Sequence, residues 1–480
     1  MVKIEELNEG GKTSKENDSP INKKEIIKAL LKDVLYNSLA QAIIKIFLTP
    51  YLILKAFLFV FVVVSTSLAS YSVIQSIMIY FSFGVSTTSR TIFEMPTLFP
   101  KVTFCNVNEK ATEYAYNISL TNGGSSTEER KKFGHDLEDI LIECLFNDIE
   151  CDETNFTWSY DSNFGNCYTF NSGFDSHGNL TDLKQSTLAG LNFGLRMTLY
   201  VNVYEKLLTL GPEDNDDSNV PSLGAVVRIG NSSYLTDYLD GGIFLSPGFK
   251  TYINVDREFK SILSKPYSNC EIDSNSPKFR QDSDLYNLIA QSEYEYTQQL
   301  CFTQCLQKKF INKYNCTLYY LISLYNKSVC DTNMVNLIYS SNDSFDSNYI
   351  NTYCLPLCPL ECNQTLYKTS ISTVQLNGYK FITSIKNNTN LAFDFINRTL
   401  DAITARDSFV SVRVYYESLS YISSTELPQM DVPTLLGSIG GNLGLFLGIS
   451  VFSLYELVEV IVEIIFILSE RKMVKPLRLK

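Results

Sequence analysis

Two long apolar stretches lie near the ends of the chain, and the region between them is mostly polar. The first, YLILKAFLFVFVVVSTSLASYSVIQSIMIYF, covers residues 51–81 and is almost uncharged after Lys55. The second covers residues 435–468. Each is longer than the ~20 apolar residues that cross a bilayer core. We therefore predict two transmembrane helices that flank a central region of roughly 350 residues.

Charged residues beside the two stretches indicate their orientation. About fifty mostly polar residues precede the first stretch, and no small-residue cleavage site stands where a signal peptide would have one. Cationic flanks favour the cytosol. Those flanks are Lys23, Lys24, Lys28, Lys32 and Lys45 on one side, and Arg471, Lys472, Lys475, Arg478 and Lys480 on the other. We expect a multi-pass protein of the plasma membrane with both termini in the cytosol.

This topology divides the chain into five parts. A cytosolic segment (1–50) contains KKEIIKALLKDVLYNSLAQAIIKIF, a pattern typical of a helix that lies on membrane lipid. It is followed by the first transmembrane helix (51–80), an extracellular domain (81–432), the second transmembrane helix (433–468) and a cytosolic tail (469–480).

Cysteine use and charge support an extracellular middle. All twelve cysteines lie between Cys105 and Cys362, which predicts six disulfides in an oxidising compartment. Zinc is the alternative, but its sites usually include histidines, and the chain has only His135 and His177. Both histidines lie in polar, loop-like contexts, so we expect them to be solvated. The net charge of −12 argues against nucleic acid and suits a surface that concentrates cations.

The extracellular part mixes two periodicities. RMTLYVNVY and SFVSVRVYYESL alternate as strands do, whereas DLYNLIAQSEYEYTQQLCFTQCLQKKF has helical spacing. This mixture predicts an α+β domain. The sequence has no H-E-x-x-H, G-x-S-x-G or P-loop motif, so we expect neither an enzyme nor a cofactor or metal site.

Glycines form a regular stripe in the second apolar stretch, within GSIGGNLGLFLGIS. Gly437, Gly441, Gly444 and Gly448 are spaced by 4, 3 and 4 residues, so they share one face of a helix. One interpretation is a line of close approach where copies of this helix meet around an axis. The other is ordinary small-residue packing between two membrane helices.

Three glutamates follow in the same stretch. Glu456, Glu459 and Glu463 are also spaced by 3 and 4 residues. A carboxylate at the bilayer centre costs ~2.5–3.5 kcal/mol on insertion scales, so a lipid-facing row would be heavily penalised. A face with bare backbone above and carboxylates below suits a water-filled, cation-attracting pore. The alternative is that the lower glutamates reach the inner interface.

The length of this stretch predicts an interruption. Residues 435–468 as one helix would measure ~50 Å, against a bilayer core of ~30 Å. The helix must therefore tilt strongly or break, and Gly448-Ile449-Ser450 is the natural break. A short extended stretch there would point backbone carbonyls at the axis, where they replace water around an ion.

At these residues the sequence resembles the degenerin, epithelial sodium channel and acid-sensing channel family. GGNLGLFLGIS is similar to the family signature GG-x-x-GLFLG-x-S. LFPKVTFCN resembles FPAVTICN, GNCYTFNSG resembles GKCYTFNSG, and CLPLCPLECNQTLYKTSIS is similar to the cysteine-rich PLEC-type stretch. The resemblance spans both predicted helices and the region between them. It implies an outer domain made of palm, β-ball, finger, thumb and knuckle.

The resemblance also implies a function and its residues. The chain would be one subunit of a homo- or heterotrimeric, amiloride-blockable sodium channel opened by an extracellular ligand. Its selectivity filter would be Gly448-Ile449-Ser450, with Gly444 at the position linked to amiloride block. Thr434 falls near the position where bulky residues lock such channels open, and Glu456 and Glu459 match the acidic pair below the filter.

Several positions depart from the family pattern. Ala40-Gln41 stand where many members have the gating pair His-Gly, Ser438 replaces a frequent aspartate at the pore mouth, and Tyr267 replaces a tryptophan at the thumb base. YFSFGVSTTSR lacks the histidine of acid-sensing members, and the tail lacks P-P-x-Y. These departures favour a member gated by a peptide or another ligand rather than by protons.

The disulfide pairing is carried over from the family, because twelve cysteines allow many pairings. The implied bridges are Cys105–Cys167, Cys144–Cys151, Cys270–Cys362, Cys301–Cys358, Cys305–Cys354 and Cys316–Cys330. Cys301 and Cys305 are one helical turn apart, so they can face a returning strand together.

Four other functions stay open. The chain could form a proton-gated channel, a constitutively open channel, or an auxiliary subunit that is silent without related partners. A remoter alternative is the ATP-gated trimeric channel, which shares the two-helix plan but should have lysine-rich ATP motifs and ten cysteines.

Overall fold

The computed structural model of the chain describes residues 49–108, 127–161, 164–201, 223–231, 241–271, 284–292, 294–318, 321–331, 347–386 and 408–448, together with isolated positions between and beyond these ranges. It divides into two compact units. One contains both ends of the chain, Met1–Gly84 and Pro428–Lys480, and the other contains Val85–Leu427.

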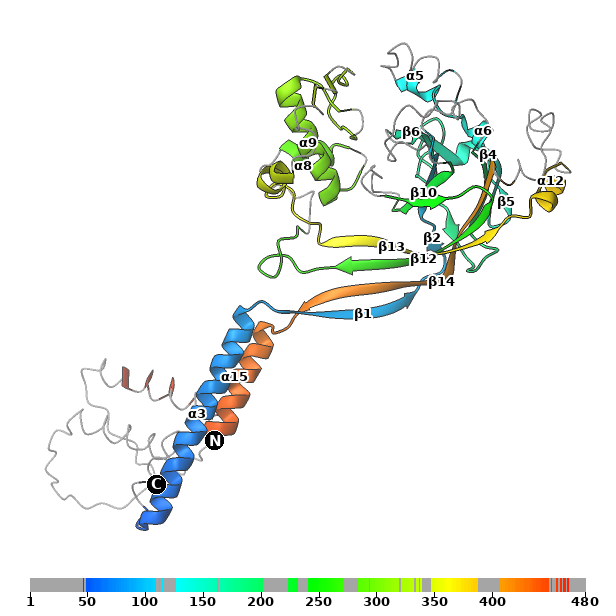
Figure 1. Ribbon diagram of the computed structural model, residues 1–480. Helices are drawn as coiled ribbons and strands as arrows, with labels where there is room; N and C mark the ends of the chain where they lie inside the picture. The colour runs from blue at the N-terminus through cyan, green and yellow to red at the C-terminus, as the bar shows by residue number, and fades with distance from the viewer. Residues whose placement is uncertain are drawn as a thin grey trace, which may run out of the picture. The chain divides into compact units, whose positions relative to one another are not determined.

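The first unit is a pair of apolar helices. Helix α3 (Leu52–Phe81) has 30 residues and, within the described part of the chain, is the one helix long and apolar enough to cross a membrane. Helix α15 (Val432–Leu447) is a shorter apolar helix of 16 residues. The two helices lie side by side (Figure 1). Most large apolar side chains of α3 are exposed in the single chain.

The second unit is built on two main sheets. The seven-stranded sheet has the order β13 (Asn363–Gln375), β12 (Phe249–Ser261), β14 (Phe409–Pro428), β9 (Leu195–Tyr200), β4 (Leu141–Phe146) and β5 (Ile149–Glu150), with β1 (Val85–Phe93) also paired to β14. The five-stranded sheet has the order β11 (Ile243–Leu245), β10 (Ala225–Gly230), β3 (Lys101–Asn106), β7 (Gly165–Phe170) and β6 (Phe156–Asp161). The short strands β2 (Thr97–Leu98) and β8 (Gln185–Ser186) form a separate pair.

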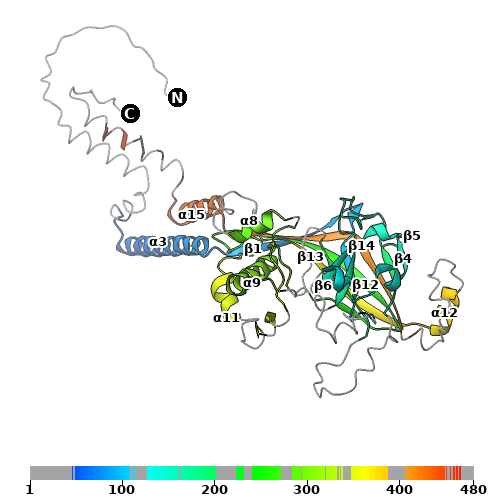
Figure 2. The ribbon, with the colours of Figure 1, turned by 90° about the horizontal axis from the view of Figure 1, so that it is seen from above.

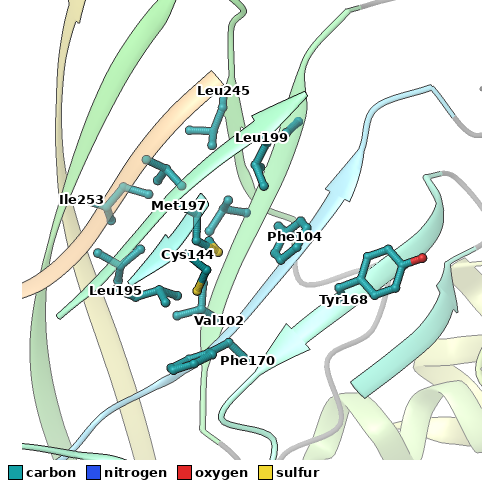
Figure 3. Packing of buried hydrophobic residues seen from close by; sticks show 14 of the residues in the cluster. Val102, Phe104, Cys144, Tyr168, Phe170, Leu195, Met197, Leu199, Leu245 and Ile253 are labelled. Atoms are coloured by element: carbon teal, nitrogen blue, oxygen red, sulfur yellow. The ribbon is translucent and has the colours of Figure 1, made fainter. Parts of the chain in front are cut away.

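The main hydrophobic core lies between these two sheets. Alternate residues of β9 and β14, such as Met197 and Val412, are fully buried because one face of each strand points inward. They meet Phe104 and Phe170 from the five-stranded sheet (Figure 3). The structure therefore has the predicted α+β class. Its core is formed by the inward-facing residues of the two sheets.

Helices of the second unit lie outside the sandwich. They are α5 (Thr127–Lys131), α6 (Leu137–Ile140), α8 (Asp284–Ala290), α9 (Gln298–Tyr314), α11 (Ser347–Tyr349) and α12 (Gly378–Lys386), with a 3-10 turn η1 (Glu153–Asn155) and a π-helical turn η5 (Ile350–Cys354). Helices α8, α9 and α11 gather at one end of the seven-stranded sheet, and α12 lies at the other (Figures 1 and 2).

The long helical pattern of residues 284–310 is two helices rather than one. Helix α9 has its own N-cap, Thr297, whose Oγ1 accepts a hydrogen bond from the N–H of Leu300 at 3.1 Å. Such a cap satisfies one of the backbone donors that a helix start leaves unpaired. Asn315 ends α9 in the left-handed conformation, with φ of 59°. The periodicity across 284–310 did not reveal the capped start at Thr297.

Six disulfides join all twelve cysteines, every one of which lies in the described part of the chain. They are Cys105–Cys167, Cys144–Cys151, Cys270–Cys362, Cys301–Cys358, Cys305–Cys354 and Cys316–Cys330, the same pairs that the family resemblance implies. Cys301 and Cys305 do lie on one face of α9, but Cys354 ends the π-helical turn η5 rather than a strand.

One of the two histidines is exposed to solvent and the other is buried. His177 is exposed in a turn, as expected. His135 is 8% exposed, with Nδ1 3.4 Å from Nδ2 of Asn106, so its expected solvation was wrong. The carbonyl of His135 accepts hydrogen bonds from Asn166 and Tyr168 of β7, which hold this loop against the five-stranded sheet.

We predict that the disulfides contribute unequally to stability. The Cys105–Cys167 bridge closes a loop with a separation of 62 residues, against 7 for Cys144–Cys151. Chain entropy then gives about 4 kcal/mol for the first and about 2.5 kcal/mol for the second. Replacing both cysteines of a pair by serine should therefore lower the melting temperature of the solubilised protein more for Cys105/Cys167. An equal or larger loss for Cys144/Cys151 would contradict this.

A candidate pore helix

Helix α15 begins at a well-defined cap. Asp431 is extended, and its Oδ1 accepts a hydrogen bond from the N–H of Thr434 at 2.8 Å. Pro433 follows, where the missing N–H costs nothing because the first turn has no partner for it. Hydrogen bonds from the side chain and the backbone of Thr434 hold the pKa of the Asp431 carboxyl below its usual range. The cap is therefore charged at neutral and mildly acidic pH.

One face of α15 packs against α3. Its half-buried residues recur at helical spacing, and they are Leu435, Ser438, Ile439, Asn442, Leu443, Phe446 and Leu447. The hydroxyl oxygens of Ser438 and Ser76 lie 3.2 Å apart across this contact. Small residues such as Ala69 and Ser76 line the facing side of α3, which lets the two helices approach closely.

The opposite face carries the glycines. Thr434, Gly437, Gly441 and Gly444 are all exposed in the single chain. Within the described part of the chain, a Cβ added to Gly437 or Gly441 would meet nothing within 4 Å. These two glycines therefore do not serve the packing of α15 on α3, which was one of the two interpretations of the stripe. Their bare backbone is available to a surface outside this chain.

Helix α15 ends within the apolar stretch, at the predicted position. Leu447 is its last residue, and Gly448 caps it in the left-handed conformation with φ of 70°. The N–H of Gly448 donates to the carbonyl of Gly444 at 3.0 Å and also reaches that of Leu443. The expected extended conformation of Gly448 was wrong, because this cap requires the left-handed region that glycine enters without a Cβ clash.

The other predicted positions are only partly described. Ser450 is exposed. Glu459 has a helical backbone conformation and is also exposed. Ile449, Glu456, Glu463, Ala40 and Gln41 lie outside the described residues. Tyr267 is half-buried in the loop after β12, where its N–H donates to the carbonyl of Ser264 at 3.0 Å. Tyr267 belongs to the other unit, Val85–Leu427.

Two features of this helix pair were not foreseen. Ser438, which the resemblance assigns to the pore mouth, turns toward α3 and not toward the glycine face. Its partner Ser76 was not singled out either. The spacing of Ser65, Ala69, Ser72 and Ser76 could have indicated a packing face in the first apolar stretch. Among the described residues, no cluster of histidine, cysteine or carboxylate side chains is arranged to hold a metal ion.

Comparison with known proteins identifies the family. A family model described as amiloride-sensitive sodium channel matches residues 110–460, which is most of the chain. The chain belongs to the amiloride-sensitive sodium channel family. The match includes the whole of α15 and most of the disulfide-bonded unit.

Several relatives of the family are similar over most of this chain. Acid-sensing ion channel 1C of Danio rerio is 26% identical over 84% of this chain and 77% of its own length. The epithelial sodium channel subunit gamma of Neoceratodus forsteri is 27% identical over 71% of this chain, and the subunit beta of Xenopus laevis is 28% identical over 70%. The chain spans about half the length of these epithelial relatives.

A solved structure of a proton-activated chloride channel aligns with 85% of the chain at 6% identity. Its TM-score of 0.32 is too low to support an argument about the fold. Membership of the amiloride-sensitive sodium channel family makes this a membrane channel protein and not an enzyme, with a disulfide-rich extracellular α+β domain.

We predict that bulk on the glycine face disturbs assembly rather than folding. Gly441→Leu adds a side chain where the single chain has open space, so the chain itself should still fold. Leu436→Phe, at another exposed position of α15, is the matched control. Chemical cross-linking and size-exclusion chromatography should show loss of oligomer for Gly441→Leu only. An undisturbed oligomer would mean that this face meets lipid.

Proposed function

We propose that the chain is a subunit of a trimeric, amiloride-sensitive, sodium-selective channel of the plasma membrane, opened by an extracellular peptide. The related proteins named as epithelial sodium channel subunits support assembly with related chains. The observation that carries the proposal is the end of α15 at Gly448, next to a face of exposed glycines.

Helix α15 is too short to cross a bilayer core by itself. Sixteen residues of α-helix measure ~24 Å, whereas a bilayer core is ~30 Å thick. If residues 433–468 cross the membrane, the helix therefore ends inside it. A backbone break in lipid leaves polar groups unpaired, which is tolerated only inside protein or beside water. A water-filled pore beside Gly448 satisfies this requirement.

The break also suits an ion filter. Three copies of Gly448-Ile449-Ser450 around an axis would present backbone carbonyls and the Ser450 hydroxyl to a dehydrated cation. Glycine at 441, 444 and 448 would let the three backbones approach the axis closely. Glu456 and Glu459, further along the chain, would raise the local cation concentration on the cytosolic side.

The proposed topology follows from the same segments. Helix α3 would be the first membrane span and residues 433–468 the second, with both termini in the cytosol. The unit with six disulfides would then be the ligand-receiving domain, and Thr434 would stand near the outer end of the pore. The family resemblance divides the disulfide-bonded unit into palm, β-ball, finger, thumb and knuckle.

Two carboxylates near the ends of the strands that lead to the helix pair stay charged in mild acid. Burial raises the pKa of the Glu94 carboxyl, but hydrogen bonds from Arg257 and Thr97 and the charge of Arg257 outweigh it, so the net shift is downward from 4.5. The pKa of Asp431 is also lowered. Carboxylates with lowered pKa values lose their charge only below their usual range, well under pH 6. Together with the absence of a histidine in YFSFGVSTTSR, this supports a stimulus other than protons, and we propose an extracellular peptide.

We predict that Gly448→Val abolishes sodium current while the protein still reaches the cell surface. Valine cannot adopt the left-handed conformation of Gly448 without strain, and its side chain would occupy the proposed filter. The measurement is whole-cell current together with surface biotinylation. Leu445→Val, another exposed position of α15, is the control and should conduct normally. Normal sodium current in Gly448→Val would refute the filter assignment.

We predict a graded effect along the glutamate row. Glu456→Gln should lower the single-channel conductance or the sodium selectivity, because a charge near a pore concentrates cations. Glu463→Gln is the matched control and should have a smaller effect, since it is expected at the inner interface. Equal and negligible effects would mean that both carboxylates lie outside the conduction path.

We predict that acid alone opens little current down to about pH 6. The lowered pKa values of Glu94 and Asp431 keep both groups charged throughout this window. The measurement is a fast pH step from 7.4 under voltage clamp, with an acid-sensing channel as the positive control. A large transient sodium current in this chain would contradict the assignment of a non-proton stimulus.

A further inference from the structure

Strand β14 changes its register against β12 at one point. The partners Val255 and Tyr416 are followed by Arg257 and Tyr421, so β14 contains three more residues than β12 over this step. The side chain of Asn254 holds the resulting bulge. Its Oδ1 accepts the N–H of Glu417 at 3.0 Å, and its Nδ2 donates to Oε2 of Glu417 at 2.8 Å.

Arg257 occupies the position just after this bulge. Its side chain is 4% exposed, and its guanidinium lies over the rings of Phe259 and Tyr421 at 5.0 and 5.1 Å. It forms an ion pair with Glu94 and donates a hydrogen bond to Oγ1 of Thr97 at 3.1 Å. A buried cation is tolerated only when it is paired in this way, so these contacts are strongly specified.

The partners of Arg257 belong to segments that lead to the membrane helices. Glu94 directly follows β1, which begins four residues after the end of α3. Tyr421 lies in β14, which ends four residues before α15 begins. The N–H of Glu94 also donates to the carbonyl of Leu419, in the bulge of β14, at 3.0 Å. One side chain of β12 therefore joins both strands through which the extracellular unit is covalently connected to α3 and α15.

We propose that Arg257 is a coupling residue for gating. Its ion pair with Glu94 holds the bulge of β14 and the end of β1 in one arrangement on β12. Opening or closing of the channel changes that arrangement. The inference rests on the proposed channel function. A change in the spacing of the two strands separates the guanidinium from Glu94, Thr97 or Tyr421. The pair therefore favours the conformation in which all three contacts are made.

A purely structural role is the alternative, and the chain offers a matched control for it. Arg228 is 6% exposed, pairs with Asp161 at 2.7 Å and lies over the ring of Phe164 at 5.2 Å. It belongs to β10 of the five-stranded sheet, away from β1 and β14. Lysine keeps the charge at either site but loses the planar fork that contacts several acceptors at once.

The test compares Arg257→Lys, Glu94→Gln and Arg228→Lys in the full-length channel. Glu94→Gln is the milder variant, because the Glu94 side chain is 43% exposed and glutamine keeps its shape. The first readout is hydrogen–deuterium exchange of peptides that cover residues 416–421 and 92–98, in lipid nanodiscs. The second is the ratio of basal to maximal current, normalised to surface protein. Maximal current is measured after adding Thr434→Phe to each variant, a substitution that we expect to lock the channel open.

Arg257→Lys and Glu94→Gln should each speed exchange in both peptides and change the current ratio about threefold or more, a coupling typical of residues in contact. Arg228→Lys should change neither. Unchanged exchange, or faster exchange with an unchanged current ratio, would overturn the proposal. Absence of current in the otherwise unmodified channel and in its Thr434 variant would instead refute the channel function, and the exchange data would still decide whether Arg257 holds the bulge.

Discussion

A helix that ends inside an apolar segment must find partners for the backbone groups that it exposes, and the proposed pore follows from this requirement. Helix α15 ends at Leu447 after 16 residues, and Gly448 closes it by turning into the left-handed region. The cap satisfies the carbonyls of Leu443 and Gly444, but those of the following residues need water, protein or an ion. A second chain or an aqueous pore must therefore lie beside this point if the segment spans a membrane.

The division of α15 into two faces is consistent with this account. Its bulky face is used within the chain, where it packs on α3 and pairs Ser438 with Ser76. Among the described residues, nothing lies within 4 Å of a Cβ built at Gly437 or Gly441 on its glycine face. Such a helix can contact α3 and further copies of itself at the same time. The extracellular unit, which contains six disulfides, supplies β1 and β14 as the two connections to the helix pair.

Patterns in the sequence predicted the local features well. Apolar length located α3, alternation indicated the strands of the sandwich, and glycine content indicated the break after Leu447. The conformation of Gly448 was missed because a glycine-rich break is compatible with both extended and left-handed backbone. The orientation of Ser438 depends on which face of α15 meets α3, and spacing alone does not decide this.

Features that join distant parts of the chain could not be predicted from local pattern. Glu94 and Arg257 are 163 residues apart, and their pairing depends on the parallel register of β12 and β14 and on the bulge between them. The burial of His135 likewise depends on Asn166 and Tyr168 of a strand about thirty residues later. The disulfide pairs were available only through the family resemblance, because spacing leaves many pairings open.

The most direct test of the account is the reversal potential of the current carried by this chain. The chain is purified with Thr434→Phe, which is expected to hold the channel open, and is reconstituted into a planar bilayer under opposing sodium and potassium gradients. The account predicts a current that reverses near the sodium equilibrium potential and is blocked by amiloride. A current that reverses at the chloride or potassium potential, or a bilayer that stays silent although the chain has assembled, would contradict it.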